Sequence, residues 1–283
     1  MEPERAPTGA VPGAVPSAVP SAVEDVGPYG LSWQDGIVLV QLRCGKANAL
    51  NPRTLAAIDQ ALDGAERGGA RGVVLTGYDR FFSAGLDLVT LYDLAPAALD
   101  VFMREFDRVM LRVFAFPRPL VAAIGGHAVA GGCVLALAGD ARVMTIGEAR
   151  IGLNEIRLGV PFPASALEIA RHAVSPTFLD SVLAEGDLYG APEALVRGLV
   201  HDLTGGDVVG PALAACRRLS AMPAGPFAAI KAALRAPAIE RARVQADALR
   251  QAFVEAWYAP DGRRLIGEAR ARLIERSRDR GGA

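Results

Sequence analysis

The chain has 283 residues, which is enough for one large domain or two ordinary ones. Its net charge of −1 at pH 7 argues against nucleic acid as a partner, because binding to phosphates requires a concentrated basic face. The mean hydropathy is +0.25, but no apolar run approaches the ~18 residues of a membrane span, so we expect no membrane insertion. The cysteines have no metal-ligand spacing, so we predict no metal site and reduced thiols in a cytoplasmic protein.

Residues 1–27 are predicted to form a disordered tail built on a repeated Ala-Val-Pro unit. Each proline removes a backbone donor and favours extended geometry in the residue before it, so neither a helix nor a sheet can persist. Proline also interrupts every apolar stretch, so we expect no secretory signal. The rest of the chain is divided into a core at 28–205 and a helical region at 206–283.

The first ordered elements are predicted to be two strands, 31–34 and 37–42. The Asp-Gly pair between them favours a hairpin, because both residues tolerate positive φ. A helix follows, with Asn51 as its cap and Pro52 at its first position. A glycine pair ends this helix, and a buried strand is predicted at 72–76.

Strands and helices then alternate along the core. The strand–loop–helix unit recurs twice, with strands at 119–124 and 141–145 and helices beginning at Gly131 and near Pro163. This alternation predicts an α/β fold, layered or spiral, in which helices cover the strands.

Beyond residue 205 only helices are predicted. Their expected ranges are 208–221, 226–234, 238–257 and 261–278. In the third of them, Leu249, Phe253 and Trp257 form an apolar stripe at a spacing of four residues. The stripe either packs on the core of its own chain or contributes to an oligomer contact.

The segment FFSAGLDL, residues 81–88, directly follows a predicted buried strand. Its Ser83, Ala84 and Gly85 are small, which lets a ligand approach the backbone closely. The alternative is an ordinary turn between a strand and a helix. Asp87 is expected to cap that helix.

A second segment, GGHAVAGGCVLAL at 125–137, places a glycine pair at the start of an apolar helix. Unpaired N–H groups at a helix start stabilise an oxyanion that develops during a reaction. The glycines could instead serve only to let helices pack closely. His127 is expected to be satisfied by backbone bonds rather than to act in catalysis.

The third segment, RIGLNEIRLG at 150–159, surrounds Glu155 with apolar residues. A carboxylate that loses its solvation there has a raised pKa, which suits a general base or acid. The alternative is a surface glutamate paired with Arg157 or Arg150.

In this order and spacing, the three segments resemble the crotonase (enoyl-CoA hydratase/isomerase) superfamily over residues 30–205. The resemblance implies a crotonase-like spiral of ββα units, followed by a C-terminal helical oligomerisation region. It also implies assembly as a homotrimer or homohexamer.

The same resemblance implies an acyl-CoA thioester as the partner, with its carbonyl held between the N–H groups of Ala84 and Gly131. Coenzyme A is then part of the substrate, and no separate cofactor is expected. The positions that match the region around CoA and the reacting acyl group are Lys46, Ser83, Gly85 and Asp87.

One difference separates the members of the superfamily. Hydratases use two glutamates, and here the second is present as Glu155, whereas the first position is Val134, which cannot orient water. One base beside an oxyanion hole is still sufficient for a 1,3-proton shift. The three segments are more similar to those of Δ3,Δ2-enoyl-CoA isomerases, and Val134 and Phe162 are predicted to line the substrate site.

Three hypotheses follow. The first is an enoyl-CoA isomerase that moves a double bond from C3 to C2 through a dienolate. The second is another crotonase reaction, such as hydration, thioester hydrolysis or decarboxylation. The third is a catalytically idle acyl-CoA-binding subunit, against which the intact Glu155 and both small-residue turns speak.

Overall fold

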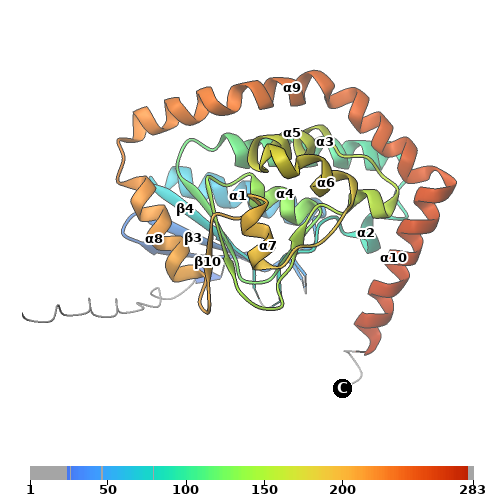
Figure 1. The fold of residues 1–283 in the computed structure, drawn as a ribbon, viewed down its shortest axis with the longest axis horizontal. Helices are drawn as coiled ribbons and strands as arrows, with labels where there is room; N and C mark the ends of the chain where they lie inside the picture. The colour runs from blue at the N-terminus through green and yellow to red at the C-terminus, as the bar shows by residue number, and fades with distance from the viewer. Residues whose placement is uncertain (1–23, 26, 46, 79, 280–283) are drawn as a thin grey trace, which may run out of the picture.

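The computed structural model describes residues 24–25, 27–45, 47–78 and 80–279 (Figure 1). Most of the predicted tail, residues 1–23, lies outside the described residues. Strand β1 (Glu24–Asp25) pairs antiparallel with β2 (Tyr29–Gln34). The large sheet therefore begins within the segment that the sequence analysis assigned to the tail.

A seven-stranded sheet has the order β1-β2-β3-β4-β6-β8-β10. Its strands are antiparallel from β1 to β3 and parallel from β3 to β10. The predicted hairpin is confirmed, since Asp35 and Gly36 join β2 to β3 with φ of 53° and 76°. The remaining strands are β3 (Ile37–Leu42), β4 (Gly72–Thr76), β6 (Leu120–Ile124), β8 (Ala141–Thr145) and β10 (Asp202–Thr204).

Alternate residues of this sheet face two apolar layers. Val38 and Val73 belong to the main core, whereas Val74 and Val121 pack in a second cluster together with α8 (Val209–Ser220). Because helices cover both faces, the strands are buried almost throughout, which explains their continuous apolar sequences.

The helices of the core follow the strands along the chain. The predicted cap at Asn51 is confirmed, because its side chain accepts a hydrogen bond from the Thr54 N–H at 3.0 Å. The helices are α1 (Pro52–Arg67), α2 (Leu88–Leu91), α3 (Pro96–Ala115), α4 (Gly131–Leu137), η1 (Glu155–Leu158), α5 (Ala164–Ala173), η2 (Pro176–Phe178), α6 (Leu179–Ala184) and α7 (Ala191–Val196).

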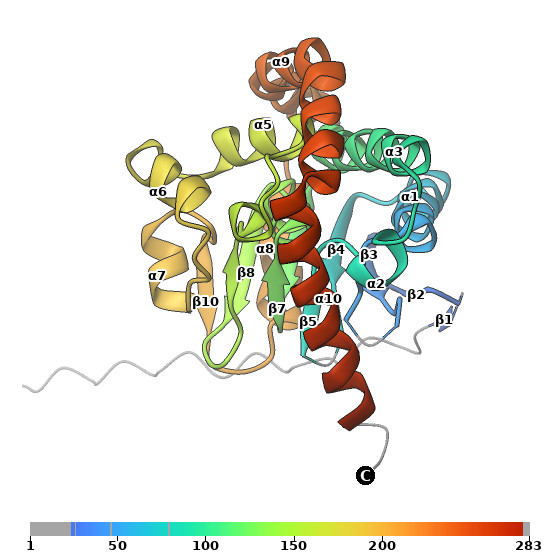
Figure 2. The ribbon, with the colours of Figure 1, turned by 90° about the vertical axis from the view of Figure 1, so that its right-hand side faces the viewer.

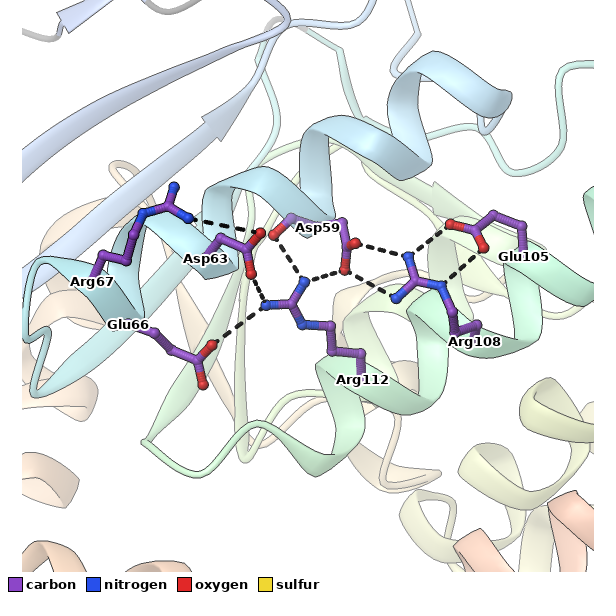
Figure 3. A network of polar contacts seen from close by, with 7 residues as sticks. All are labelled: Asp59, Asp63, Glu66, Arg67, Glu105, Arg108 and Arg112. Atoms are coloured by element: carbon purple, nitrogen blue, oxygen red, sulfur yellow. Dashed lines mark hydrogen bonds and ion pairs between the residues drawn. The ribbon is translucent and has the colours of Figure 1, made fainter.

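Ion pairs join α1 to α3 across the surface (Figure 3). Arg108 of α3 donates to the Asp59 carboxylate at 2.7 Å. Arg112, one turn further along α3, binds Asp59 and Asp63 of α1. The paired side chains are partly exposed, so each pair stabilises the packing of the two helices by at most about 1 kcal/mol.

The C-terminal region consists of α8, α9 (Ala224–Tyr258) and α10 (Pro260–Asp279). The prediction of separate helices at 226–234 and 238–257 is wrong, because α9 continues through Pro237 as one helix. Figure 1 shows α9 crossing the top of the molecule, and Figure 2 shows α10 descending from it. In the described part of the chain, no helix combines the length and the apolar character that crossing a bilayer requires.

Candidate active site

A small parallel sheet brings the three sequence segments together. It consists of β5 (Phe81–Ser83), β7 (His127–Val129) and β9 (Ile151–Gly152), with β7 in the middle. Residues that follow parallel strands emerge at one edge of a sheet. A Cβ built on Gly85 would lie 3.2 Å from the Gly131 nitrogen, so the first two segments are in close contact there.

A cavity of about 220 Å³ lies at this edge of the small sheet. Its walls are mainly apolar, and its inner end is formed by buried side chains from α3 and α9. Helix α10, which packs against α2 and η1, supplies the outer wall. The residues that form the inner end are Met103, Phe106, Phe253 and Trp257, and those of α10 are Ala269, Arg272 and Leu273.

Glu155 is the first residue of η1 and lies on the cavity wall with only 7% of its surface exposed. Burial in this apolar site raises its pKa from about 4.5 to about 8. Among the described residues, no group forms a hydrogen bond with its Oε2 atom. The surface alternative is therefore excluded, and Arg157 pairs with Asp187 instead. A buried carboxyl with one oxygen that no described group binds is available to exchange a proton with a ligand.

Gly131 begins α4 beside the cavity. The first bond of this helix runs from the Val134 N–H to the Ala130 carbonyl at 3.0 Å, so the Gly131 N–H precedes the hydrogen-bonded turns. Ala130 has a φ of 50°, and its N–H is held by the Gly152 carbonyl at 2.9 Å. A Cβ on Gly131 would lie 2.9 Å from the Leu50 side chain and 3.2 Å from that of Phe106, so there is little space for a larger residue.

The second backbone donor is not the one expected from the sequence. The Ala84 N–H already donates to the Ala47 carbonyl at 3.0 Å, so it is not free for a ligand. Leu86 forms a parallel bridge with Leu50, in which the Leu50 N–H binds the Gly85 carbonyl and the Asp87 N–H binds the Leu50 carbonyl. In such a bridge the N–H of Leu86 points away from Leu50. Leu86 also lines the cavity, and it replaces Ala84 as the candidate donor.

The other residues predicted near CoA have mostly structural contacts. The buried Ser83 donates through its hydroxyl to the Asn48 carbonyl at 2.8 Å. Asp87 caps α2, as expected, by accepting from the Thr90 N–H at 3.1 Å. Gly85 has a φ of 82°, and a Cβ there would lie 2.7 Å from the Val129 carbonyl oxygen. Lys46 lies outside the described residues.

Val134 and Phe162 do not lie where the sequence analysis placed them. Val134 is fully buried inside α4, in the main core rather than on the cavity wall. Phe162 lies in a separate apolar groove on the other side of Val160. The chain after η1 passes between the two spaces: Val160 and Pro163 line the cavity, whereas Pro161 and Phe162 line the groove.

Several cavity residues were missed or left undecided by sequence reasoning. Of the stripe on α9, Phe253 and Trp257 are buried and line the cavity, whereas Leu249 is half-buried in a groove, and an oligomer contact through the stripe stays a prediction. Met103 and Phe106 belong to a helix that the sequence analysis did not identify, although its apolar residues recur at helical spacing. His127 accepts from the Arg150 N–H at 3.1 Å through Nδ1, in agreement with a structural role.

Comparison with known proteins agrees with the family resemblance seen in the sequence. The family described as enoyl-CoA hydratase/isomerase matches residues 32–278. A putative enoyl-CoA hydratase of Thermus thermophilus is 39% identical over 160 residues, which are 55% of this chain and 62% of that protein. The mitochondrial enoyl-CoA delta isomerase 1 of Mus musculus is 33% identical over 190 residues, which are 66% of this chain and 64% of that protein. The matched region thus spans less than two thirds of either relative.

The fold comparison extends over more of the chain. The crystal structure of human mitochondrial delta3-delta2-enoyl-CoA isomerase superposes with a TM-score of 0.84 at 27% identity. The superposition covers 88% of this chain and 99% of the human one. The expected crotonase-like α/β fold followed by C-terminal helices is therefore confirmed, and the structure shows that it contains two sheets.

Proposed function

Because the chain belongs to the enoyl-CoA hydratase/isomerase family, also called crotonases, we propose that it moves a double bond from C3 to C2 of an acyl-CoA thioester. The observation that carries the proposal concerns the acidic groups. Among the described residues that line the cavity, Glu155 is the only acidic side chain. One carboxyl suits a proton shift, whereas the hydratases that the sequence resembles use two.

The thioester is proposed to bind with its carbonyl oxygen between the N–H groups of Leu86 and Gly131. Both residues line the cavity, and the Gly85 and Gly131 backbones that carry them are in close contact. Two fixed donors stabilise the negative charge that develops on this oxygen when the neighbouring carbon loses a proton. The apolar inner end of the cavity then receives the acyl chain.

The proton moves through Glu155. Its carboxylate removes a proton from C2 of the 3-enoyl thioester, and the electrons of the broken C–H bond delocalise to the thioester oxygen as a dienolate. The carboxylic acid then returns the same proton to C4, the C3=C4 double bond moves to C2=C3, and the carboxylate is restored. A pKa near 8 makes the group basic enough to accept the proton and acidic enough to return it.

Hydration would need a second polar group to hold and activate water. At the matching position Val134 is apolar, and its burial within α4 removes it from the cavity wall. The relatives include both a hydratase and an isomerase by name, so the reaction has to be measured.

The test compares two reactions of the same preparation. We expect purified protein to convert 3-hexenoyl-CoA to 2-hexenoyl-CoA much faster than it hydrates 2-hexenoyl-CoA. Both are followed by the absorbance of the conjugated enoyl thioester, which rises in the first reaction and falls in the second. Rapid hydration with little isomerisation would assign the chain to the hydratases. Binding of hexanoyl-CoA without either reaction would favour the idle subunit.

A further inference from the structure

Two apolar spaces in this protein share one wall. The first is the catalytic cavity, and the second is a groove of about 490 Å³ between η1, α5, α6 and α9. Val160 lines both of them. The groove is otherwise formed mainly by the side chains of Ile156, Phe162, Leu167, Leu183 and Leu249.

The spacing of residues along two elements shows that the spaces are neighbours. On α9, Phe253 lines the cavity and Leu249, one turn earlier, lines the groove. On η1, Leu158 faces the cavity and Ile156 faces the groove. Val160, only 5% exposed, follows directly and stands between the two. Val160 is therefore the one described residue that lines both spaces, and its side chain is called the partition below.

The groove has the chemistry of a site for an alkyl chain. All of its described lining residues are apolar, and Ile156 is 48% exposed at its edge. Because the groove adjoins the catalytic cavity at Val160, it could receive the distal methylene groups of an acyl chain once that side chain is shortened.

We propose, on the basis of the function proposed above, that Val160 sets the upper limit of acyl chain length. In the wild-type protein the chain ends in the cavity against Val160, so long acyl groups are poor substrates. Removing the two methyl groups of this side chain would join the cavity to the groove. A longer chain would then pass from Phe253 to Leu249 along α9.

The experiment measures the ratio of kcat/KM for 3-hexadecenoyl-CoA to that for 3-hexenoyl-CoA. Val160→Ala is expected to raise this ratio by about tenfold or more, the scale of a few methylene contacts. Adding Leu249→Gln to Val160→Ala should return the ratio towards the wild-type value, because the amide makes the groove polar. Val74→Ala, a buried valine on the opposite face of the large sheet, is the matched control and should leave the ratio unchanged.

Two further measurements separate an effect on chain length from a loss of folding and from an error in the proposed reaction. Val160→Ile, which thickens the partition, should lower the ratio of 3-octenoyl-CoA to 3-hexenoyl-CoA turnover, and it does not open a void in the core. The ratio of the affinity for hexadecanoyl-CoA to that for hexanoyl-CoA, measured by calorimetry, should rise in Val160→Ala and fall back in the double variant, as the kinetic ratio does, even if the protein catalyses another reaction. The proposal is overturned if wild type already prefers the longer chain, or if neither substitution at position 160 changes the ratios.

Discussion

Glu155 is the proposed catalytic base, and the burial that raises its pKa also makes this side chain costly to the stability of the fold. The folded protein keeps its carboxyl in an apolar cavity, where the charged form lacks solvent and, among the described residues, a partner for Oε2. The raised pKa reflects that cost, because the folded protein keeps the Glu155 proton at pH values at which the unfolded chain has released it. Two predictions follow from this single side chain.

The first concerns catalysis. Glu155→Gln keeps the shape of the side chain but cannot accept a proton, so we expect a loss of about a hundredfold or more in kcat. The affinity for hexanoyl-CoA, measured by calorimetry, should remain within a factor of about three, because the backbone donors and the cavity are unchanged. Normal turnover by this variant would show that another group moves the proton.

The second concerns stability. Between pH 4.5 and 8, the folded state binds the Glu155 proton and the unfolded state does not, so this residue lowers the free energy of unfolding as the pH rises. Glu155→Gln removes that dependence. At pH 8 the variant should melt at least about 2–4 °C above wild type, whereas at pH 5 the two midpoints should nearly coincide. Equal midpoints at both pH values would contradict the raised pKa.

At the scale of elements, the site depends on how tightly the turn after β5 packs on the turn after β7. Gly85 is required there for two reasons, a φ of 82° and the Val129 carbonyl oxygen 2.7 Å from where a Cβ would stand. A side chain can be placed only if the two turns separate. Since Leu86 and Gly131 belong to these turns, their N–H groups would separate as well.

We therefore expect Gly85→Ala to reduce kcat by at least about tenfold and the free energy of unfolding by about 1–3 kcal/mol. Gly64→Ala is the matched control, because Gly64 lies in α1 with open space around it. That substitution should stabilise the protein by about 0.5–1 kcal/mol and leave turnover unchanged. Denaturant titration and steady-state rates measure both effects. Full activity of Gly85→Ala would disprove the placement of the two donors.

At the scale of the whole molecule, buried charges fasten α9 to the large sheet. Lys231 and Arg235 of α9 donate to the Asp140 carboxylate at 2.7 Å and 2.8 Å. Burial lowers the pKa of Lys231 to about 8 despite this partner. Arg235 lies two residues before Pro237. These contacts therefore hold α9 to the core just before the position where proline would usually end a helix.

Asp140→Asn should consequently reduce the free energy of unfolding by about 3–5 kcal/mol, because it leaves two buried cations without an anion. Glu268→Gln is the control, since it breaks only a surface pair with Arg264 and should cost less than about 1 kcal/mol. Denaturant titrations of both variants supply the comparison. Similar values for the two would mean that the buried cluster does not hold α9 in place. Assembly as a trimer or hexamer stays a prediction, for which sedimentation of the wild-type protein is the measurement.

The sequence by itself determined the elements whose causes are local. The Asp-Gly hairpin, the Asn51 cap and the buried strands depend on residues close together in the chain, and the structure has them as predicted. Glu155 could also be identified, because three segments occur in an order and spacing that resemble one superfamily. The continuous α9 could not be predicted, since proline ends most helices, and the bond between Arg235 and Asp140 beside Pro237 joins residues far apart in the chain.

Only the tertiary structure decided which groups share the site. Ala84 and Leu86 are two residues apart, and nothing in their side chains tells which N–H is free. The bonds to Ala47 and Leu50, from a loop more than thirty residues earlier, settle that question. The position of Phe162 likewise depends on tertiary packing, because it lies in the groove while Val160 and Pro163 line the cavity. Contacts between distant segments decide which N–H groups point into the cavity and which side chains line it. The spacing of residue types along the chain does not reveal those contacts.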